Sequence, residues 1–474
     1  MVNFPKKRGV GCVYRYVYLQ PRCLRNIFIT GLFALSGLLN SPSGFSAEIP
    51  TILAKSGTGR PQATAAVRIS HQEQQVRQVR PENYNLKRYP VIDRHKSHWR
   101  NLLWITAVVE PQEPYVAEGL NGILALTTRS KLSKSQIQII NMAMQVGTQL
   151  YLSNPNIYAS MEQQFLQTIE RSHNSQWVAM ALSGLAKRKI APDKLRQLSA
   201  HIRQRFPNWS QDVFLQTTLR EVAHTLAPTR VPPLRDLLKR TIAPAPHLYV
   251  ICQPDREVLC QAVLKNRNGQ FVRQNGQLWS VPLLLQSIHG LGWNFIRGQT
   301  PQGIYRIEGV VPPSGNEFFR AYGQFPLLKL FLPFESGVRE FLPGRKGRFT
   351  GSIEAYLALL PPSWRRYLPI QQSYWAGKMG RSLLRIHGSG EAPDLFNKKV
   401  RYLDSYNWNP TIGCLSALEL YDKAGKLQQA DMPKILNALT TVGGKNFAGY
   451  MIVVEIPSSS KAPISVAETE VILQ

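Results

Sequence analysis

The sequence lacks the short motifs that are typical of metal and nucleotide chemistry. It has only five cysteines in 474 residues and no paired Cys-x-x-Cys. It has no His-Glu-x-x-His motif and no Walker loop, and its nine histidines are scattered without ligand spacing. Because these motifs are absent, we expect the protein to have no metal site and no cofactor. The Ser458 and Lys461 pair lies in a proline-flanked segment without a Lys-Thr-Gly partner, which excludes a penicillin-binding serine site.

Acidic residues are scarce as well. There are 29 Asp and Glu against 57 Lys and Arg, a formal net charge of +28. Such a surplus is typical of a protein with a polyanionic partner, although it can equally be a solvated surface. The length leaves room for two or three domains, and an apolar content of 43% indicates a globular chain.

The N-terminus has no apolar run long enough for a confident membrane-spanning helix. Six basic residues and no acidic one precede the apolar run 26–39, and small residues end it at 44–47. This order predicts a signal peptide over 1–47, with an uncleaved anchor or a transit segment as alternatives. Its removal would lower the charge by six, to +22. Export to the periplasm or cell envelope of a bacterium disfavours nucleic acid as the partner and favours an anionic envelope polymer or a membrane surface.

Three cysteines remain after this segment. Cys252 and Cys260 flank a turn between two apolar runs, so a disulfide between them depends on whether the strand register places them opposite each other. Cys414 has no obvious partner in either case. A lone exported thiol is either a buried core residue or a group that is kept free because it reacts.

The pattern along the chain predicts several segments. Residues 48–112 carry many basic and few acidic residues and predict a basic flexible linker. Residues 113–243 have helical spacing, with capping boxes starting at Ser133 and Ser160, and predict an all-α domain built as a plain bundle. From 245 to 457, short strand-like runs and Asn-Gly turns predict a mainly-β (α+β) domain. Residues 458–474 would form a C-terminal tail.

Three fragments of this second domain carry chemistry. They are Thr300-Pro301-x-Gly303-x-Tyr305, Ile386-His387-Gly388 and Thr411-Ile412-Gly413-Cys414. In this order they resemble the catalytic domain of the L,D-transpeptidases of the YkuD type, which are exported bacterial cysteine enzymes of peptidoglycan. The resemblance covers residues 245–457, less than half of the chain. The predicted signal peptide and the unpaired thiol agree with it.

The resemblance fits the chemistry of the residues. Acyl transfer at an amide needs a nucleophile, and a thiol with a pKa of about 8.5 needs a neighbouring base. His387 would accept the Cys414 proton and later return it to the leaving amine. Gly413 leaves room for its own and the Cys414 N–H to face an oxyanion. By resemblance, Thr411 is the hydroxyl of the motif and Gly388 forms the turn after the base.

The chain departs from the family pattern at three points. His387 and Cys414 are 27 positions apart, more than is usual, which predicts an inserted loop within 391–408. Ile412 replaces a second histidine, which leaves His387 as the base candidate and resembles the subgroup with hydrolytic activity on murein cross-links or attached proteins. Ser416 replaces the usual Asn or Arg. Substrate carboxylates would then be bound by Arg385, Lys399 or Arg401.

Two further features complete the prediction. Residues 310–382 are rich in aromatics and proline and predict either an inserted lid-like segment or a packed subdomain. His289 lies in another Ile-His-Gly triplet, where the family has no catalytic residue, so we expect it to be structural. The predicted fold is thus multidomain: an N-terminal all-α helical domain plus a mainly-β (α+β) L,D-transpeptidase-like catalytic domain with an inserted lid-like segment.

The predicted function is an exported cysteine acyltransferase that acts on peptidoglycan stem peptides through a Cys414 thioester. The alternatives are a murein amidase or carboxypeptidase-type hydrolase that uses the same Cys-His pair, a catalytically degenerate wall-binding module, and an exported basic binding protein with an accidental resemblance. The sequence does not identify the partner of the helical domain.

Overall fold

The computed structural model of the chain describes residues 63–312, 323–388, 405, 407–457 and 462–473. The predicted signal peptide, Lys399 and Arg401 lie outside the described residues. The segment 49–474 forms one compact unit. No helix within the described ranges is both long enough and apolar enough to cross a membrane.

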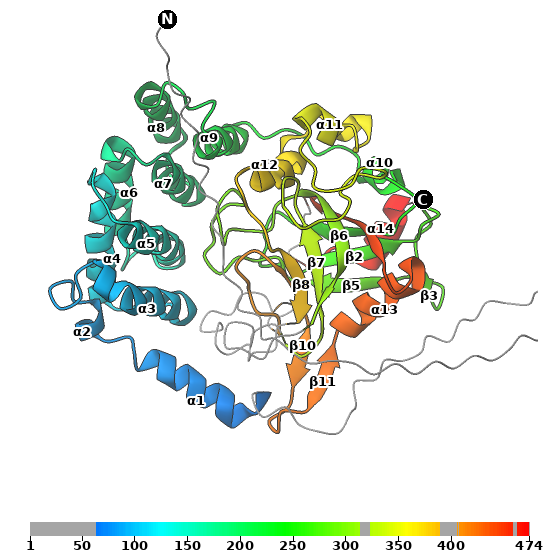
Figure 1. Cartoon of the computed structure of the whole chain (residues 1–474), viewed down its shortest axis with the longest axis horizontal. Helices are drawn as coiled ribbons and strands as arrows, with labels where there is room; N and C mark the ends of the chain where they lie inside the picture. The colour runs from blue at the N-terminus through cyan, green and yellow to red at the C-terminus, as the bar shows by residue number, and fades with distance from the viewer. Residues whose placement is uncertain (1–62, 313–322, 389–404, 406, 458–461, 474) are drawn as a thin grey trace, which may run out of the picture. The chain divides into compact units, whose positions relative to one another are not determined.

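The described chain begins with a helical region that ends before residue 240. Its α-helices are α1 (Ala65–Val76), α2 (Pro81–Tyr84), α3 (Lys96–Val109), α4 (Pro114–Leu124), α5 (Lys134–Ser153), α6 (Ser160–Arg171), α7 (Ser175–Lys187), α8 (Pro192–Arg205), α9 (Val213–Leu226) and α10 (Leu234–Lys239). Helices α3, α5, α7 and α9 pack one against the next, and α4, α6 and α8 flank this row (Figure 1). This two-row stack differs from the plain bundle that the sequence predicts.

Helix starts follow local chemistry only in part. At α5 the predicted capping box is present: the Ser133 hydroxyl accepts from Gln136 N–H at 3.2 Å, and the Gln136 side chain accepts from Ser133 N–H at 2.8 Å. At α6 the prediction is wrong, because the helix already includes Ser160 and its N-cap is Ala159. Tertiary packing sets that boundary, since Met161 and Phe165 are fully buried.

The prediction of a flexible linker over 48–112 is wrong for the part that the structure describes. Residues 65–109 form α1, α2 and α3, and Trp99 and Leu103 are fully buried in the same hydrophobic core as the later helices. The Trp99 indole also donates to the Tyr89 carbonyl at 3.0 Å. Although the segment is rich in basic residues, its apolar side chains have a helical spacing. Their burial offsets the conformational entropy that is lost when the segment becomes ordered.

The rest of the chain forms a mixed sheet. Its strands occur in the order β5-β2-β1-β12-β6-β7-β8-β9. Their bounds are β1 (His247–Cys252), β2 (Cys260–Lys265), β5 (Ser280–Leu283), β6 (Gly303–Val311), β7 (Leu327–Phe331), β8 (Arg385–Gly388), β9 (Leu415–Ala417) and β12 (Ala448–Glu455). Two short hairpins, β3 (Arg273–Gln274) with β4 (Gln277–Leu278) and β10 (Glu419–Tyr421) with β11 (Leu427–Ala430), lie beside it. One helix of this body, α13 (Met432–Gly443), precedes β12.

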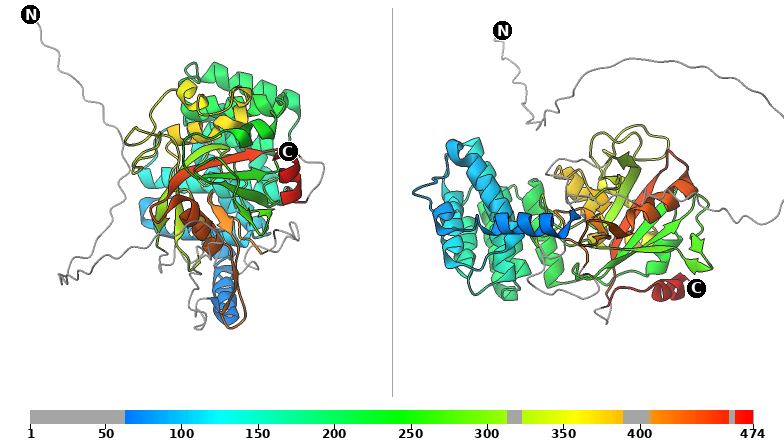
Figure 2. Two further views of the ribbon diagram at one scale, coloured as in Figure 1. Left: turned by 90° about the vertical axis from the view of Figure 1, so that its right-hand side faces the viewer. Right: turned by 90° about the horizontal axis from the view of Figure 1, so that it is seen from below.

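The sheet nearly closes into a barrel. β1 pairs parallel to β12, β8 pairs parallel to β9, and the other neighbours are antiparallel. Leu284, the residue after β5, exchanges both backbone hydrogen bonds with Ser416 of β9 at 2.9 Å, so the two edge strands meet. The further views show the strong twist of these strands (Figure 2). A multidomain chain with a helical region followed by an α+β sheet is therefore confirmed.

The disulfide that the sequence left open is present. Cys252 and Cys260 are bonded, and the antiparallel register of β1 and β2, in which Ile251 faces Gln261, brings them opposite each other. Within the described residues Cys414 is the free cysteine, and it is buried.

The predicted insertion at 310–382 is not a lid over a separate domain. It contains β7, which pairs with both β6 and β8 inside the sheet. Its aromatics, including Phe341, Tyr356 and Trp364, are buried in the core of the sheet region. Its helices α11 (Ile353–Leu357), η5 (Pro362–Trp364), η6 (Leu368–Gln371) and α12 (Gln372–Lys378) follow. Past the insertion, the predicted tail includes a helix, α14 (Val466–Leu473).

The helical region and the sheet region contact each other through residues 286–300, which we call the bridging segment. Leu291 and Phe295 of this segment are buried in the core of the helical region. Its Asn294 side chain donates to the Thr218 hydroxyl of α9 at 2.6 Å. Helix α1 makes a second connection, since Ala65 N–H donates to Lys423 O in the β10–β11 turn at 3.0 Å (Figure 2).

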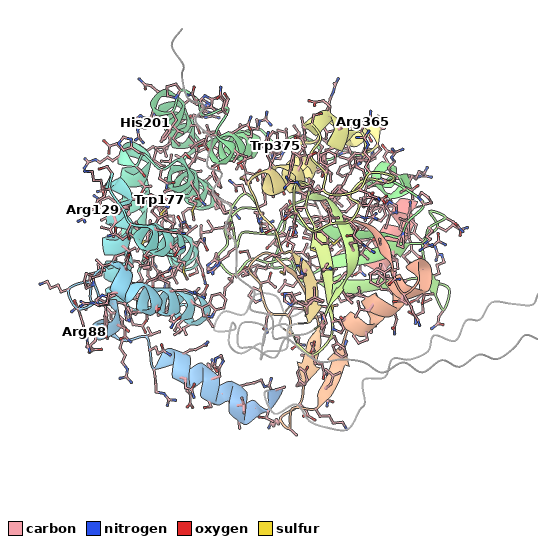
Figure 3. All side chains as sticks on the ribbon, viewed as in Figure 1. Arg88, Arg129, Trp177, His201, Arg365 and Trp375 are labelled. Atoms are coloured by element: carbon pink, nitrogen blue, oxygen red, sulfur yellow. A yellow bond between two sulfur atoms is a disulfide. The ribbon has the colours of Figure 1, made fainter. Side chains whose placement is uncertain are left out.

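Some large side chains are buried in or between the two regions, whereas many basic side chains are exposed on the surface. Trp177 is buried within the helical stack, and Trp375 faces the helical region from α12 (Figure 3). Arg88, Arg129 and Arg365 are exposed on the outside of the molecule, as part of the basic surplus (Figure 3).

Candidate active site

The predicted nucleophile and base lie on neighbouring strands. In the parallel pair β8–β9, His387 faces Ser416 and Ile386 faces Leu415. Continuing this register back by one residue places Cys414 opposite Arg385. Cys414 lies in the bend that precedes β9, so the register places its loop beside the start of β8, on the strand that also carries His387.

The thiol itself contacts other groups. The Cys414 Sγ lies 3.9 Å from the Leu383 carbonyl oxygen, which is its acceptor. Burial raises the pKa of the Cys414 thiol above its ordinary value, and Glu335 raises it further. The backbone N–H of Arg385 and the cations of Arg385 and Arg381 oppose this shift of the pKa. His387 is not among the described groups that shift the pKa of the Cys414 thiol.

The His387 ring is oriented for a base. Its Nδ1 lies 3.0 Å from the Gly388 carbonyl, and since a carbonyl only accepts, Nδ1 carries the proton. Nε2 is then the basic nitrogen of the neutral ring. Burial lowers the pKa of His387 to about 4, so the ring is neutral at pH 7. A neutral acceptor nitrogen is what a general base requires before the reaction.

The Thr411–Cys414 loop is tied by one hydroxyl. The Thr411 Oγ1 donates to the Cys414 carbonyl at 2.6 Å and accepts from Gly413 N–H at 3.1 Å. The Gly413 N–H is therefore engaged within the loop and does not face an oxyanion, contrary to the prediction. The hydroxyl of the motif is a structural tie in this conformation, and the Cys414 N–H is the remaining oxyanion donor of the predicted pair.

The bridging segment holds this loop from the other side. Thr411 N–H donates to Gln286 O at 3.0 Å, and Ile288 N–H donates to Thr411 O at 2.8 Å. Thr300, from the first of the three motif fragments, donates its hydroxyl proton to Gly413 O at 3.0 Å. The position of Cys414 thus depends on the segment that also enters the helical core.

The glycine before the nucleophile is required by a close approach. Gly413 has φ +119°, a region that favours glycine. A Cβ at this position would lie 2.6 Å from Arg381 Nη2 and 2.9 Å from Gly298 O. The space is filled by a buried guanidinium, which the sequence analysis did not identify.

Two buried carboxylates near the site were also missed. Glu335 accepts from Leu332 N–H at 3.0 Å and from Leu383 N–H at 2.9 Å, which fixes the backbone whose carbonyl faces the thiol. Glu419 accepts from Gln324 N–H at 2.9 Å, and one of its oxygens would lie 1.9 Å from a Cβ at Gly388. An acidic residue in an apolar stretch, as in Ala417-Leu418-Glu419-Leu420, is the signal that could have indicated Glu419.

The other predicted site residues have mixed outcomes. Gly388 is the last residue of β8, paired with Ala417, and so does not form a turn. Ser416 is fully buried, opposite His387. Arg385 is half-buried beside the thiol, and its Nη1 donates to Leu384 O at 2.6 Å. Arg401 lies outside the described residues.

No protein-family model, curated protein or solved structure matches this chain. Within the part of the chain that the structure describes, no group of three His, Cys, Asp or Glu side chains could hold a metal ion. The site is therefore interpreted from its own residues.

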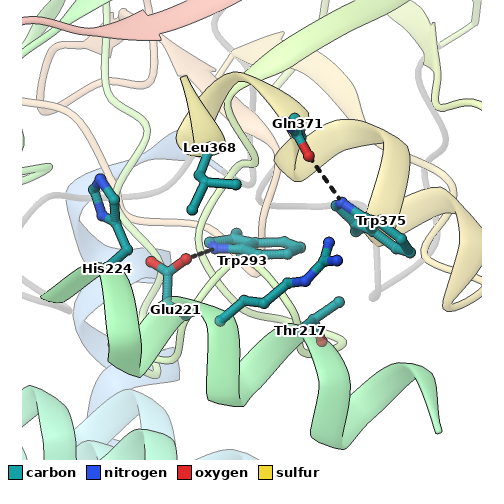
Figure 4. A pocket seen from close by; sticks show the side chains of 8 residues that line it. Thr217, Glu221, His224, Trp293, Leu368, Gln371 and Trp375 are labelled. Carbon is teal, nitrogen blue, oxygen red and sulfur yellow. Dashed lines mark hydrogen bonds between the residues drawn. The ribbon is translucent and has the colours of Figure 1, made fainter. Parts of the chain in front are cut away.

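A pocket lies between helix α9 and the η6–α12 segment of the sheet region. It is lined by Thr217, Arg220, Glu221, His224, Trp293, Leu368, Gln371 and Trp375. The Trp293 indole donates to Glu221 at 2.9 Å across it, and the Trp375 indole donates to Gln371 at 3.4 Å (Figure 4). The Arg220 guanidinium lies 5.1 Å from the Trp375 ring centre. These contacts fix α9 against the sheet region.

Proposed function

We propose that the chain is an exported cysteine acyltransferase that acts on peptidoglycan stem peptides through a thioester on Cys414. The observation that carries the proposal is the parallel pairing of β8 and β9, which brings the loop of a buried thiol next to the strand of a neutral histidine. The resemblance to the L,D-transpeptidases supplies the substrate class and the expectation of export.

The reaction needs one rotation and one proton transfer. Turning the Cys414 side chain about its Cα–Cβ bond moves Sγ from Leu383 O toward His387. Nε2 then accepts the thiol proton, and the sulfur attacks the peptide carbonyl carbon. The C–N bond breaks, the amine leaves with the proton from the imidazolium, and a thioester remains.

The second half of the reaction decides the product. An acceptor amine that attacks the thioester forms a new amide, which is a cross-link, whereas water forms a free carboxylate. In both cases His387 takes the proton of the attacking group, and the Cys414 sulfur leaves. The Cys414 N–H would donate to the oxyanion in each step, which contributes about 3 kcal/mol in comparable sites.

Charge complementarity supports an anionic substrate. Stem peptides carry free carboxylates, and the cations of Arg381 and Arg385 are close enough to shift the thiol pKa. Arg385 is half-buried, so its guanidinium can reach a substrate carboxylate at the mouth of the site. The surplus of basic residues, which is +22 without the predicted signal peptide, favours accumulation of the protein at an anionic wall.

A second candidate is a catalytically degenerate wall-binding module. It is favoured by the raised thiol pKa and by the fact that, among the described residues, the acceptor of the thiol is Leu383 and not His387. Such a module would bind muropeptides without turning them over.

The test is incubation of the protein with purified muropeptides, followed by separation and mass analysis of the products. The proposal expects products that depend on Cys414: cross-linked species if an amine is the acceptor, and trimmed species if water is. A Cys414→Ala variant is the matched control. Retained binding with no product in the wild type contradicts the acyltransferase and hydrolase proposals together and favours the binding module.

A further inference from the structure

Arg381 is a buried cation next to the loop of the nucleophile. It is 5% exposed, and its Nη2 lies 2.6 Å from the position that a Cβ of Gly413 would take. Nη1 donates to the carbonyls of Trp293 and Gln299, the latter at 2.8 Å, and Nη2 donates to the Gly298 carbonyl at 3.0 Å. The guanidinium is thus held in a cradle of backbone carbonyls from the bridging segment.

This buried cation has no carboxylate partner among the residues that the structure describes. None of the ion pairs among the described residues includes Arg381. A buried charge without a counter-ion costs several kcal/mol, and carbonyl dipoles offset only part of that cost. Burial lowers the pKa of Arg381 to about 10, opposed by Tyr305 and Cys414. Ionised Cys414 is the anion that would complete the pair.

We propose that Arg381 is a positioning residue whose guanidinium stabilises the thiolate of Cys414. This inference rests on the proposed function, in which Cys414 is the nucleophile. The proton of the thiol goes to His387 Nε2, because an arginine guanidinium is already protonated and accepts none. Arg381 supplies only its fixed positive charge.

The same charge acts twice in the cycle. The thioester is neutral, so the guanidinium favours the states in which sulfur is anionic: before attack on the substrate, and when sulfur leaves during deacylation. Since the cradle is already formed, no rearrangement of Arg381 is needed at either step.

The helical region fixes the cradle. Trp293 gives its carbonyl to Arg381 and its indole N–H to Glu221 of α9. Leu291 and Phe295, on either side of Trp293, are buried in the helical core. The sheet region alone would therefore hold Arg381 less firmly than the full chain does.

The test uses two variants of the full chain that separate charge from hydrogen bonding. Arg381→Gln keeps amide donors for the carbonyls and loses the charge, whereas Arg381→Lys keeps the charge and loses the planar fork. The rate of Cys414 alkylation by iodoacetamide is measured from pH 6 to 10. We expect the midpoint of the pH profile to rise by about one unit or more in Arg381→Gln, which is about tenfold slower alkylation below the midpoint. In Arg381→Lys we expect a shift of less than about half a unit.

Arg256 provides the matched control. It is equally buried, is bonded to Glu455 at 2.6 Å, and is not among the groups that shift the Cys414 pKa. Arg256→Gln should leave the midpoint unchanged even where it lowers stability. An unchanged midpoint in folded Arg381→Gln overturns the inference. If circular dichroism shows that Arg381→Gln does not fold, the Arg381→Lys variant is used instead. A rise of more than about one pH unit in the alkylation midpoint of folded Arg381→Lys then overturns the inference.

Alkylation needs no substrate, so the two proposals fail separately. A shifted midpoint without any muropeptide product retains the role of Arg381 and removes the acyltransferase. A muropeptide product with an unshifted midpoint retains the acyltransferase and removes the role of Arg381.

Discussion

Two Ile-His-Gly triplets place the same three residues in different surroundings. His289 is fully buried in the bridging segment, and its Nδ1 donates to Gln149 Oε1 of α5 at 3.0 Å. His387 is in β8, where Nδ1 donates to the carbonyl of its neighbour Gly388, and β8 pairs with the strand that follows the Cys414 loop. The triplet thus carries no function by itself. In one place it connects the helical and sheet regions, and in the other it lies beside a thiol.

The largest expected difference between the triplets is catalytic. His387→Gln should lower the rate of muropeptide conversion by about 10²–10⁴-fold, because the thiol loses its base. His289→Gln should change that rate by less than about threefold, since an amide retains a donor toward Gln149. Steady-state rates of the two variants measure this. Equal losses in both variants would show that His387 acts only through the fold.

The glycines offer the next contrast. Gly413→Ala forces a Cβ to within 2.6 Å of Arg381 at φ +119°, so it should displace the guanidinium and lower the alkylation rate of Cys414 several-fold. Gly290→Ala meets only a methyl group of Leu152 at 3.2 Å, at φ +60°. It should lower the free energy of unfolding by about 1–2 kcal/mol and leave alkylation unchanged. Slower alkylation in Gly290→Ala would contradict the separation of the two sites.

For the free energy of unfolding, in contrast to catalysis, we expect His289 to be important. His289→Leu removes the proton donor of the buried Gln149 oxygen and should lower the free energy of unfolding by about 1–3 kcal/mol. The alkylation rate of the folded variant should not change. Urea unfolding measures the first and iodoacetamide the second. His201→Leu, at a half-buried position on α8, is the control and should have an effect below about 0.5 kcal/mol.

A further difference between the two histidines concerns acid. Burial lowers the pKa of His387 to about 4 and that of His289 to about 3, below the unfolded value of about 6.5. Between these values the unfolded chain binds protons that the folded chain does not. Stability is therefore complete above pH 6.5 and falls with decreasing pH, by at most about 1.4 kcal/mol per pH unit for each ring.

Replacing either histidine with glutamine should flatten this dependence. In His387→Gln the lost slope should end near pH 4, and in His289→Gln it should continue to about pH 3. Urea unfolding at a series of pH values measures both slopes. An unchanged slope in both variants would show that neither ring is buried in its neutral form.

Local signals in the sequence predicted local features well. The α5 capping box and the strands around Cys252 and Cys260 follow from turn residues and apolar spacing. The prediction of a flexible linker was wrong because it rested on the basic charge of the segment, whereas Trp99 and its neighbours are buried in the helical core. β7 was missed because its place in the sheet depends on pairing with strands far along the chain.

The site shows the same division. Cys414, His387 and their order could be found in the sequence, since each lies in a short motif. Arg381 could not, because its role depends on three carbonyls of residues 293–299, more than 80 positions away. The hydroxyl of Thr411 was identified, but its partners were not, because whether a loop hydroxyl binds substrate or its own backbone is decided by tertiary structure.

The most direct test of the account is the intact mass of the protein after incubation with muropeptides and, separately, with a carbapenem, for wild type and Cys414→Ala. The account predicts a covalent adduct in the wild type, mapped to Cys414 by peptide analysis and absent from the variant. An unmodified wild type, whose folded form also resists alkylation at Cys414, would contradict it and identify the thiol as a buried core residue.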